Sequence, residues 1–103
     1  NKDKVGHLLG LEGVELFAAD LLDEGSFKKA FDGADAVIHT AAVVEIARVK
    51  DPQREIVDPS VKGVRNVLSC LSPSVKTFVH TSSIAAVHQR DKEGNVLTES
   101  DWN

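Results

Sequence analysis

The chain has 103 residues, of which 42% are hydrophobic and 27% charged, a composition typical of an ordinary globular protein and not of a disordered one. This length allows one domain at most and excludes a two-domain enzyme. The formal charge is −4, and the one adjacent basic pair, Lys28 and Lys29, lies beside Asp23 and Asp32. Because phosphate binding needs clustered Lys and Arg, no nucleic-acid partner is expected.

Cysteine content and hydropathy bear on the compartment. Cys70 is the only cysteine, so an internal disulfide and a cysteine-based metal cluster are excluded, and a reducing, cytoplasmic location is expected. No apolar run approaches the roughly eighteen residues of a membrane span, and the N-terminus lacks a signal-peptide core. The chain contains no methionine, which predicts a piece of something longer.

The first predicted elements are a helix end and a strand. Residues 2–9 read as the end of a helix, with Leu8 and Leu9 buried and Gly10 as its stop. The run VELFAA, residues 14–19, is short and almost continuously apolar. Such a run is typical of a strand that is covered on both faces.

A second helix is predicted in the segment DEGSFKKAFDG. Asp23 can cap its start, and Phe27, Ala30 and Phe31 recur at helical spacing. Gly33 supplies the stop. This helix would separate the first strand from the next one along the chain.

Two further strands and a long helix follow. The runs ADAVIHT, residues 34–40, and KTFVHTS, residues 76–82, predict strands, and residues 52–72 between them predict a helix. One helix face is apolar, with Val57, Val61, Val64, Leu68 and Leu71. Pro59 should kink this helix or, with Asp58 as its cap, start it afresh.

Alternation of strands with helices predicts the α/β class. Parallel neighbours cannot be joined by tight hairpins, so helical crossovers imply a parallel sheet with helices on both faces. Three strands are fewer than the five or six of a typical sheet, and the architecture therefore looks incomplete. The polar segment after residue 87 predicts a surface loop with one short strand-like piece, NVLTE.

The ends of the three apolar runs are expected to form one rim. Ligands of open parallel sheets bind beyond the carboxyl ends of the strands, here residues 19–21, 40–42 and 81–83. An Asp followed by Leu offers an acceptor for an exocyclic amine and an apolar wall for a flat ring, as adenine requires. A hydroxyl at another strand end can donate to a carbonyl oxygen. Alternatively, Asp20 caps the next turn, and Thr81 and Ser82 satisfy backbone groups where the strand stops.

Six segments follow one another in a familiar order: NKDKVGHLLGL, ADLLDEGSF, ADAVIHTAA, VKGVRNVLSC, VKTFVHTSS and TESDWN. In this order the chain resembles the extended short-chain dehydrogenase/reductases, above all the group of dihydroflavonol and cinnamoyl-CoA reductases, with relatives among 3β-hydroxysteroid dehydrogenases. The resemblance covers essentially the whole chain. It implies a partial Rossmann-like, doubly wound parallel sheet, with residues 1–103 as the central part of one NAD(P)-binding domain.

The resemblance also implies roles for the first two strand ends. Asp20 and Leu21 match the Asp-Leu pair that holds adenine. Thr40, Ala41 and Ala42 match the segment that runs beneath the ribose and the nicotinamide side of the cofactor. These five residues would bind NADP, with NAD as the alternative.

The third strand end matches the family's reacting side. Ser83 matches the catalytic serine that hydrogen-bonds the substrate carbonyl, while Thr81 and Ser82 shape the strand end on the cofactor side. Lys4 falls where members of the family place a lysine near the 2′-phosphate of NADP. It could equally be a plain surface lysine.

Two parts of the family's machinery are absent from the sequence. No Gly-rich fingerprint for the pyrophosphate occurs, and the chain has no tyrosine for the Tyr-x-x-x-Lys proton donor. The resemblance therefore implies the middle of an NAD(P)H-dependent reductase that transfers hydride to a small-molecule carbonyl, a ketone, aldehyde or thioester, and that is inactive as these 103 residues alone. Pairing into a homodimer through the helix at Pro59 also follows from the family.

Other readings stay open beside this one. A non-catalytic dinucleotide-binding or sensor protein would keep the same rim. His39 and His80 hold equivalent places in neighbouring strands, but no third metal ligand is evident and no metal is expected. A hydrolase built from Ser83, His88 and Asp91 lacks the Gly-x-Ser-x-Gly elbow.

Overall fold

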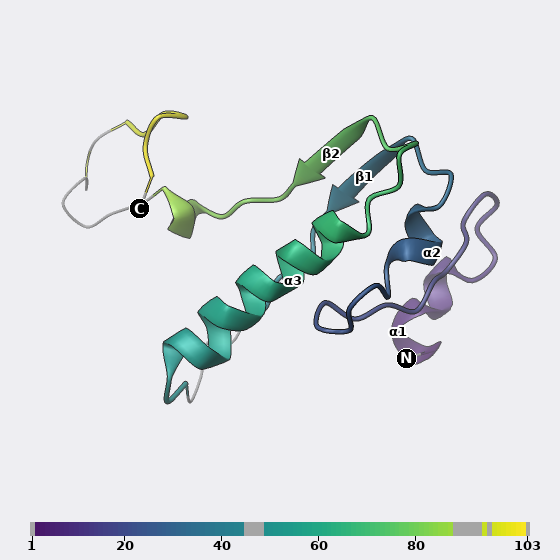
Figure 1. Cartoon of the computed structure of the whole chain (residues 1–103), viewed down its shortest axis with the longest axis horizontal. Helices are drawn as coiled ribbons and strands as arrows, with labels where there is room; N and C mark the ends of the chain where they lie inside the picture. The colour runs from purple at the N-terminus through teal and green to yellow at the C-terminus, as the bar shows by residue number, and fades with distance from the viewer. Residues whose placement is uncertain (1, 45–48, 88–93, 95, 103) are drawn as a thin grey trace.

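The computed structural model describes residues 2–44, 49–87, 94 and 96–102 (Figure 1). In chain order its elements are α1 (Lys2–Val5), the 3-10 turn η1 (Gly6–Leu8), α2 (Lys28–Phe31), β1 (Ala36–His39), the π-helical turn η2 (Gln53–Val57), α3 (Asp58–Ser69), β2 (Thr77–His80) and the 3-10 turn η3 (Ile84–Ala86). Within the described part of the chain, no helix is long and apolar enough to cross a membrane.

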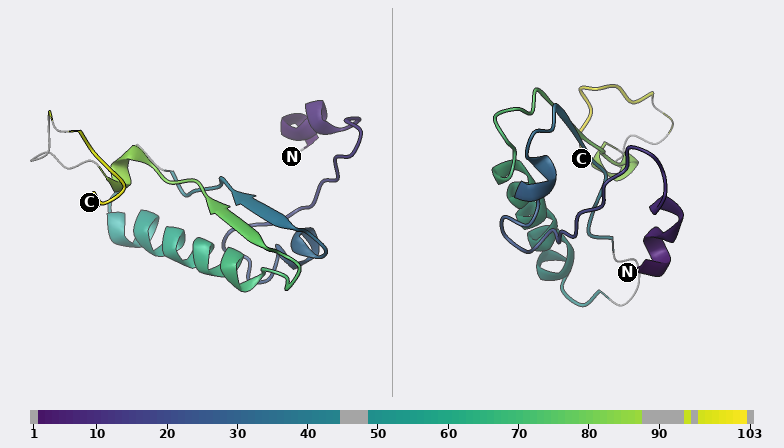
Figure 2. Two further views of the ribbon diagram at one scale, coloured as in Figure 1. Left: turned by 90° about the horizontal axis from the view of Figure 1, so that it is seen from above. Right: turned by 90° about the vertical axis from the view of Figure 1, so that its right-hand side faces the viewer.

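The centre of the fold is a parallel pair of strands joined through a helix. β1 and β2 pair in parallel, with Ala36 opposite Thr77 and His39 opposite His80. The backbone N–H of Thr81 donates to the carbonyl of His39 at 3.0 Å and carries the pairing one residue further. α3 connects the two strands and lies along one face of the pair (Figure 2). The predicted α/β class with a parallel crossover is therefore confirmed for this unit.

The buried face of α3 differs from the predicted one. Val57, Val61 and Leu68, assigned to the buried face by hydrophobic spacing, are 44 to 46% exposed. The buried positions are instead Gly63, Asn66, Val67 and Cys70. Two of these, Gly63 and Asn66, are not hydrophobic. The spacing of apolar residues therefore cannot reveal this face, because it packs through a glycine and forms hydrogen bonds through an amide side chain.

The start of α3 contains the predicted irregularity in another form. The five-residue π-helical turn precedes α3, and Pro59 occupies the first turn, where its missing N–H is tolerated. Asp58 does not cap the helix, because it already has helical dihedral angles. Its Oδ1 accepts a hydrogen bond from the Gln53 side chain at 2.6 Å. The prediction that Asp58 caps a fresh helix is thus wrong.

The second predicted helix is only four residues long, Lys28–Phe31. Residues 21–27 form turns, and Asp23 makes no side-chain cap, because the helix starts after Phe27. Gly33 has a φ of 75°, which favours glycine and ends the helix where the sequence predicts. The start of this helix was wrongly predicted and its end correctly.

The run 14–19 is not a strand. None of its residues has a strand partner among those the structure describes, and all of their side chains are exposed. Strand structure needs hydrogen bonds from a neighbouring chain segment, which an apolar composition alone does not provide. Nearby, Gly10 turns the chain at a φ of 111°, but Leu9, predicted to be buried, is 59% exposed.

The C-terminal segment agrees with a loop in its described part. Residues 94 and 96–102 contain turns and no strand, so the strand-like reading of NVLTE fails for its described residues. Asp101 Oδ2 accepts hydrogen bonds from the backbone N–H and the hydroxyl of Thr98, at 2.8 and 3.0 Å. This local turn orders the segment without a sheet partner.

Little apolar surface is buried. The accessible surface is 8529 Å², whereas a compact protein of this mass would expose about 5,700 Å². On the described residues, the buried hydrophobic side chains are Val37, Val67 and Cys70. Ile38 and Val79 are 70 and 47% exposed, so the expected cover on both faces of the sheet is not seen here.

Candidate functional site

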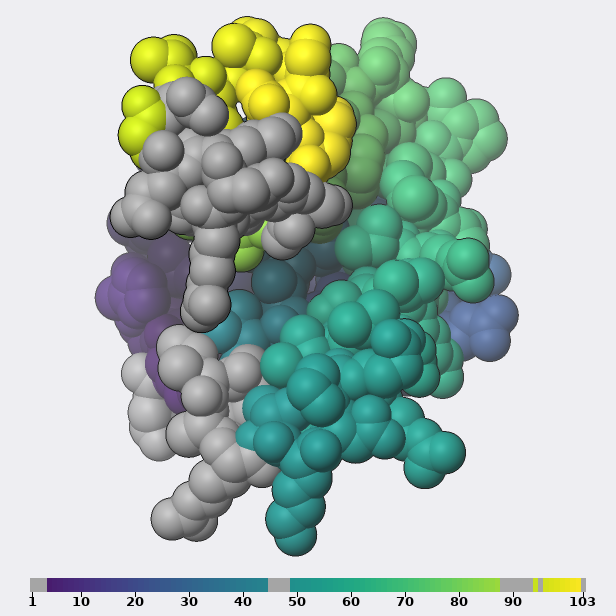
Figure 3. All heavy atoms as spheres, turned by 90° about the vertical axis from the view of Figure 1, so that its left-hand side faces the viewer, coloured from purple at the N-terminus to yellow at the C-terminus, as the bar shows by residue number. Residues whose placement is uncertain are grey.

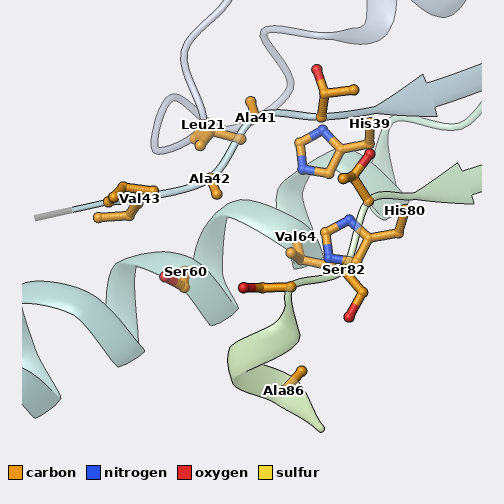
Figure 4. Close-up of a pocket in the computed structure, with 14 residues that line it drawn as sticks. Leu21, His39, Ala41, Ala42, Val43, Ser60, Val64, His80, Ser82 and Ala86 are labelled. Carbon is orange, nitrogen blue, oxygen red and sulfur yellow. The ribbon is translucent and has the colours of Figure 1, made fainter. Parts of the chain in front are cut away.

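A cleft of about 420 Å³ opens at the carboxyl ends of β1 and β2, beside α3 (Figure 4). Its lining comes from four parts of the chain: Leu21; His39, Thr40, Ala41, Ala42, Val43 and Val44; Ser60 and Val64; and His80, Thr81, Ser82, Ser83 and Ala86. In Figure 3 the blue-green atoms of the segment after β1 lie recessed beside the teal atoms of α3. The predicted meeting of strand ends at one rim is therefore seen for β1 and β2.

The segment after β1 provides a floor of small side chains. Thr40, Ala41 and Ala42 all line the cleft, and Val43 and Val44 continue it. A methyl side chain allows a ligand to come close to the backbone, and no charged group lies on this segment. The floor therefore offers small side chains, apolar except for the Thr40 hydroxyl, and no charged group.

The segment after β2 provides hydroxyl groups. Thr81, Ser82 and Ser83 line the cleft. Ser83 is extended, with φ −136° and ψ 151°, and precedes the turn η3. Its Oγ accepts a hydrogen bond from the backbone N–H of Ala85 at 3.2 Å. That bond uses an oxygen lone pair, so the O–H of Ser83 can still donate to a carbonyl oxygen in the cleft.

Leu21 is the member of the first predicted strand end that reaches the cleft. Asp20 is not part of the lining. Its Oδ1 accepts a hydrogen bond from the Leu22 N–H at 2.8 Å, so that Asp20 caps the next turn, as the alternative prediction for this residue states. Ser26 braces the same turn, because its Oγ donates to the Asp20 carbonyl at 2.8 Å. Lys4 lies exposed on α1, also outside the lining.

Two histidines stack at the inner end of the cleft. The rings of His39 and His80 lie 5.2 Å apart between centroids, at an interplanar angle of 17°. His39 is 6% exposed, and its Nε2 is buried without a hydrogen-bond partner in the structure. Burial lowers the pKa of His39 below its ordinary value, and repulsion from His80 lowers it further. His39 is therefore neutral at pH 7.

The alternative readings find limited support in the geometry. No group of three potential metal ligands occurs in the portion of the chain that the structure describes. Of the hydrolase set, His88 and Asp91 lie outside the described residues. The described residues therefore do not test the hydrolase reading.

Sequence reasoning missed several residues that form or support this cleft, among them three on α3. Ser60 and Val64 line it from α3, although Val64 was assigned only to helix packing. Asn66 does not line it but bonds to the loop that carries Leu21, with Nδ2 donating to the Leu21 carbonyl at 3.0 Å. No periodic signal marks Asn66, because its partners are backbone atoms far away in the sequence.

Comparison of the sequence with known proteins places the chain in a family. Residues 3–102 match the model of the 3-beta hydroxysteroid dehydrogenase/isomerase family. The chain belongs to this family. The predicted resemblance to the extended short-chain dehydrogenase/reductases is thereby confirmed.

Three similar proteins are reductases. Over 96% of its length the chain is 45% identical to a cinnamoyl-CoA reductase of Medicago truncatula. It is 38% identical to an anthocyanidin reductase and 37% identical to a dihydroflavonol 4-reductase, both of Arabidopsis thaliana, over 99 and 100% of its length. The chain spans 28 to 32% of the length of these relatives, or roughly a third.

Proposed function

We propose that this chain forms the cofactor rim and one corner of the active site of an NAD(P)H-dependent reductase. The reaction is hydride transfer to the carbonyl carbon of a small molecule, a ketone, aldehyde or thioester, and the tyrosine of the family's Tyr-x-x-x-Lys motif, elsewhere in the whole protein, would give the proton to the carbonyl oxygen. The observation that carries the proposal is the cleft in which a small-residue floor faces the Ser83 segment, in a chain whose named relatives are reductases.

The lining fits part of a dinucleotide. Leu21, Val43 and Val64 offer apolar walls for flat rings, and the hydroxyls after β2 suit the polar end of the ligand. The described lining contains no Lys or Arg, so it does not account for binding of the phosphates. We therefore assign this chain to the adenine and nicotinamide sides, and leave the pyrophosphate to groups elsewhere in the whole protein.

Each residue then has a stated task. We assign Asp20 and Leu21 to the adenine side, Leu21 as the wall of the cleft and Asp20 through the turn that its carboxylate closes beside Leu21, and Thr40, Ala41 and Ala42 lie beneath the ribose and nicotinamide. The reduced nicotinamide supplies the hydride when it is bound. Ser83 donates its O–H to the substrate carbonyl oxygen and stabilises the negative charge that grows there. Thr81 and Ser82 set the position of Ser83.

Several finer expectations belong to the same proposal. We expect NADP as the cofactor, with NAD as the alternative, and Lys4 as the group nearest the 2′-phosphate. The whole protein is expected in the cytoplasm, with a small-molecule substrate, no nucleic-acid or membrane partner, and pairing through α3. The chain of 103 residues is expected to be inactive alone.

The test uses the whole protein that carries this segment, with the isolated 103-residue chain beside it. NADPH fluorescence titration measures binding, and transfer of deuterium from labelled NADPH to a panel of one aldehyde, one ketone and one thioester measures turnover. Saturable binding and deuterium transfer by the whole protein support the proposal. Binding without transfer to any member of the panel would favour the non-catalytic sensor, and absence of binding would overturn both.

A further inference from the structure

The loop 20–25, which carries Leu21 into the cleft, is fastened to the buried face of α3. The loop has turns but no helix or strand of its own. Three of its backbone groups bond instead to one side chain, that of Asn66, which is 7% exposed. The position of this cleft wall therefore depends on a helix residue that does not itself line the cleft.

The Asn66 amide is fully used by these contacts. Its Nδ2 donates to the carbonyls of Leu21 and Asp23, at 3.0 and 2.7 Å. Its Oδ1 accepts from the Gly25 N–H at 2.8 Å, and the Cys70 thiol lies 3.6 Å from the same oxygen. Both N–H groups of the amide thus have acceptors, and the oxygen has donors. A buried amide satisfied in this way holds its partners in one arrangement.

A second residue on the same face of α3 fits the Leu21 side chain. Gly63 is buried one helical turn before Asn66. A methyl group placed on Gly63 would come within 3.2 Å of Leu21 Cβ and 3.5 Å of Leu21 Cδ2. Leu21 therefore packs against bare helix backbone at this point. No positive φ requires glycine here, so the reason for it is close packing.

We infer that Asn66 and Gly63 are positioning residues for the adenine side of the cleft. Asn66 fixes the backbone of Leu21 and Gly63 fixes how far its side chain can approach α3. This inference rests on the proposed function, because it takes the ligand side at Leu21 to be the adenine side. The two residues act through Leu21 and touch no ligand.

The experiment compares two halves of the cofactor on the whole protein. Calorimetric titration with 2′,5′-ADP reports the adenine side, and titration with reduced nicotinamide mononucleotide reports the other side. Asn66→Asp keeps the size and one acceptor but removes both donated bonds and puts a carboxylate oxygen against two carbonyls. We expect it to weaken 2′,5′-ADP about tenfold, with the mononucleotide within about twofold, since lost buried hydrogen bonds typically have effects of this order.

Gly63→Ala provides the variant that should keep its fold, because alanine is the better helix former. Its methyl group displaces Leu21, and we expect 2′,5′-ADP to weaken about threefold, with the mononucleotide unchanged. Val61→Ala, on the exposed side of α3, is the matched control and should alter neither affinity. Combined with Leu21→Ala, Asn66→Asp should add little further loss, because both changes remove the same wall.

The possible outcomes distinguish a failure of this inference from a failure of the proposed function. A wild-type protein that binds neither probe overturns the proposed function and the inference together. If wild type binds both, equal losses of the two probes in the variants show a general structural role and overturn the inference alone. Full additivity of Asn66→Asp with Leu21→Ala does the same, because it shows that Asn66 does not act through Leu21.

Discussion

The two strand ends carry nearly the same sequence but differ in environment. AVIHTAA ends β1 and TFVHTSS ends β2, and the pairing sets His39 directly opposite His80. Yet His39 is buried, with 6% exposure, whereas His80 is exposed. After the shared threonine, the segment that follows β1 continues with two alanines, whereas the segment that follows β2 continues with two serines. Similar local sequence thus gives an inert floor at one strand end and hydrogen-bond donors at the other.

Under the proposed function, this difference suits a cleft that holds a cofactor and polarises a substrate. The side next to the cofactor needs room and no competing donors, which alanines provide. The side next to the substrate needs a donor at the carbonyl oxygen, which a serine provides. The comparison predicts that changes at the β2 end act on chemistry and changes at the β1 end act on binding.

The largest effect is expected from Ser83→Ala in the whole protein. Without the O–H donor, kcat for carbonyl reduction should fall by about 10²–10³, the usual loss for one donor to a developing oxyanion. The affinity for NADPH should stay within about twofold, since the hydroxyl addresses substrate and not cofactor. Steady-state kinetics with a fluorescence titration on the same sample check both. A loss of NADPH affinity with normal kcat would reverse the roles of the two strand ends.

The next effect is expected from Ala42→Leu at the β1 end. The larger side chain fills part of the cleft floor, and NADPH should bind about tenfold more weakly, as for an overpacked site. Ala36→Leu is the matched control, because Ala36 lies at the start of the same strand, exposed and outside the cleft lining. Equal effects of the two substitutions would mean that the floor does not contact the cofactor.

The strand ends also show how far the sequence allows prediction. β1 and β2 were predicted because each run is apolar, and in the structure each finds the other as a partner. The run 14–19 has the same composition but no partner among the described residues, and it is not a strand. Pairing depends on residues distant in the chain, so composition predicts a capacity for strand formation and does not establish the strand itself.

A similar limit applies to the site. The rule that ligands bind at strand ends predicted that the segments after β1 and β2 meet at the cleft; Leu21 also reaches the cleft, although the run before it is not a strand. It did not predict that the Asp20 carboxylate closes a local turn, or that Asn66 holds the loop. These contacts join backbone atoms to side chains, and backbone atoms have no signature in the sequence.

A modest effect on stability is expected from the buried histidine. The folded protein holds the pKa of His39 below its ordinary value of 6.5, whereas the unfolded chain does not. Between the lowered folded pKa and 6.5 the unfolded state binds more protons, so the free energy of unfolding falls as the pH is lowered through this window. Below the folded pKa this contribution becomes constant.

Urea unfolding of the whole protein at pH 7.5 and 5.5 measures this effect. In wild type the urea concentration at the midpoint of unfolding should be lower at pH 5.5 than at pH 7.5. In His39→Phe, which cannot titrate at this position, this decrease should be smaller. His80→Gln removes only the smaller, repulsive cause and should reduce the pH dependence slightly. An unchanged pH dependence in His39→Phe would show that His39 is not buried as a neutral ring.

The smallest effect is expected from Ser82→Ala, the neighbour of Ser83. Ser82 and Ser83 both line the cleft, but successive side chains of an extended segment leave the backbone in different directions, and Ser83 has extended dihedral angles. Only one of the two serines can therefore address a given carbonyl oxygen, and kcat should fall by less than about threefold in Ser82→Ala, well below the loss typical of a missing oxyanion donor. Kinetics measured beside Ser83→Ala decide the matter. A large loss of kcat in Ser82→Ala with a small loss in Ser83→Ala would contradict this prediction. It would show that Ser82, and not Ser83, donates the hydrogen bond to the substrate carbonyl oxygen.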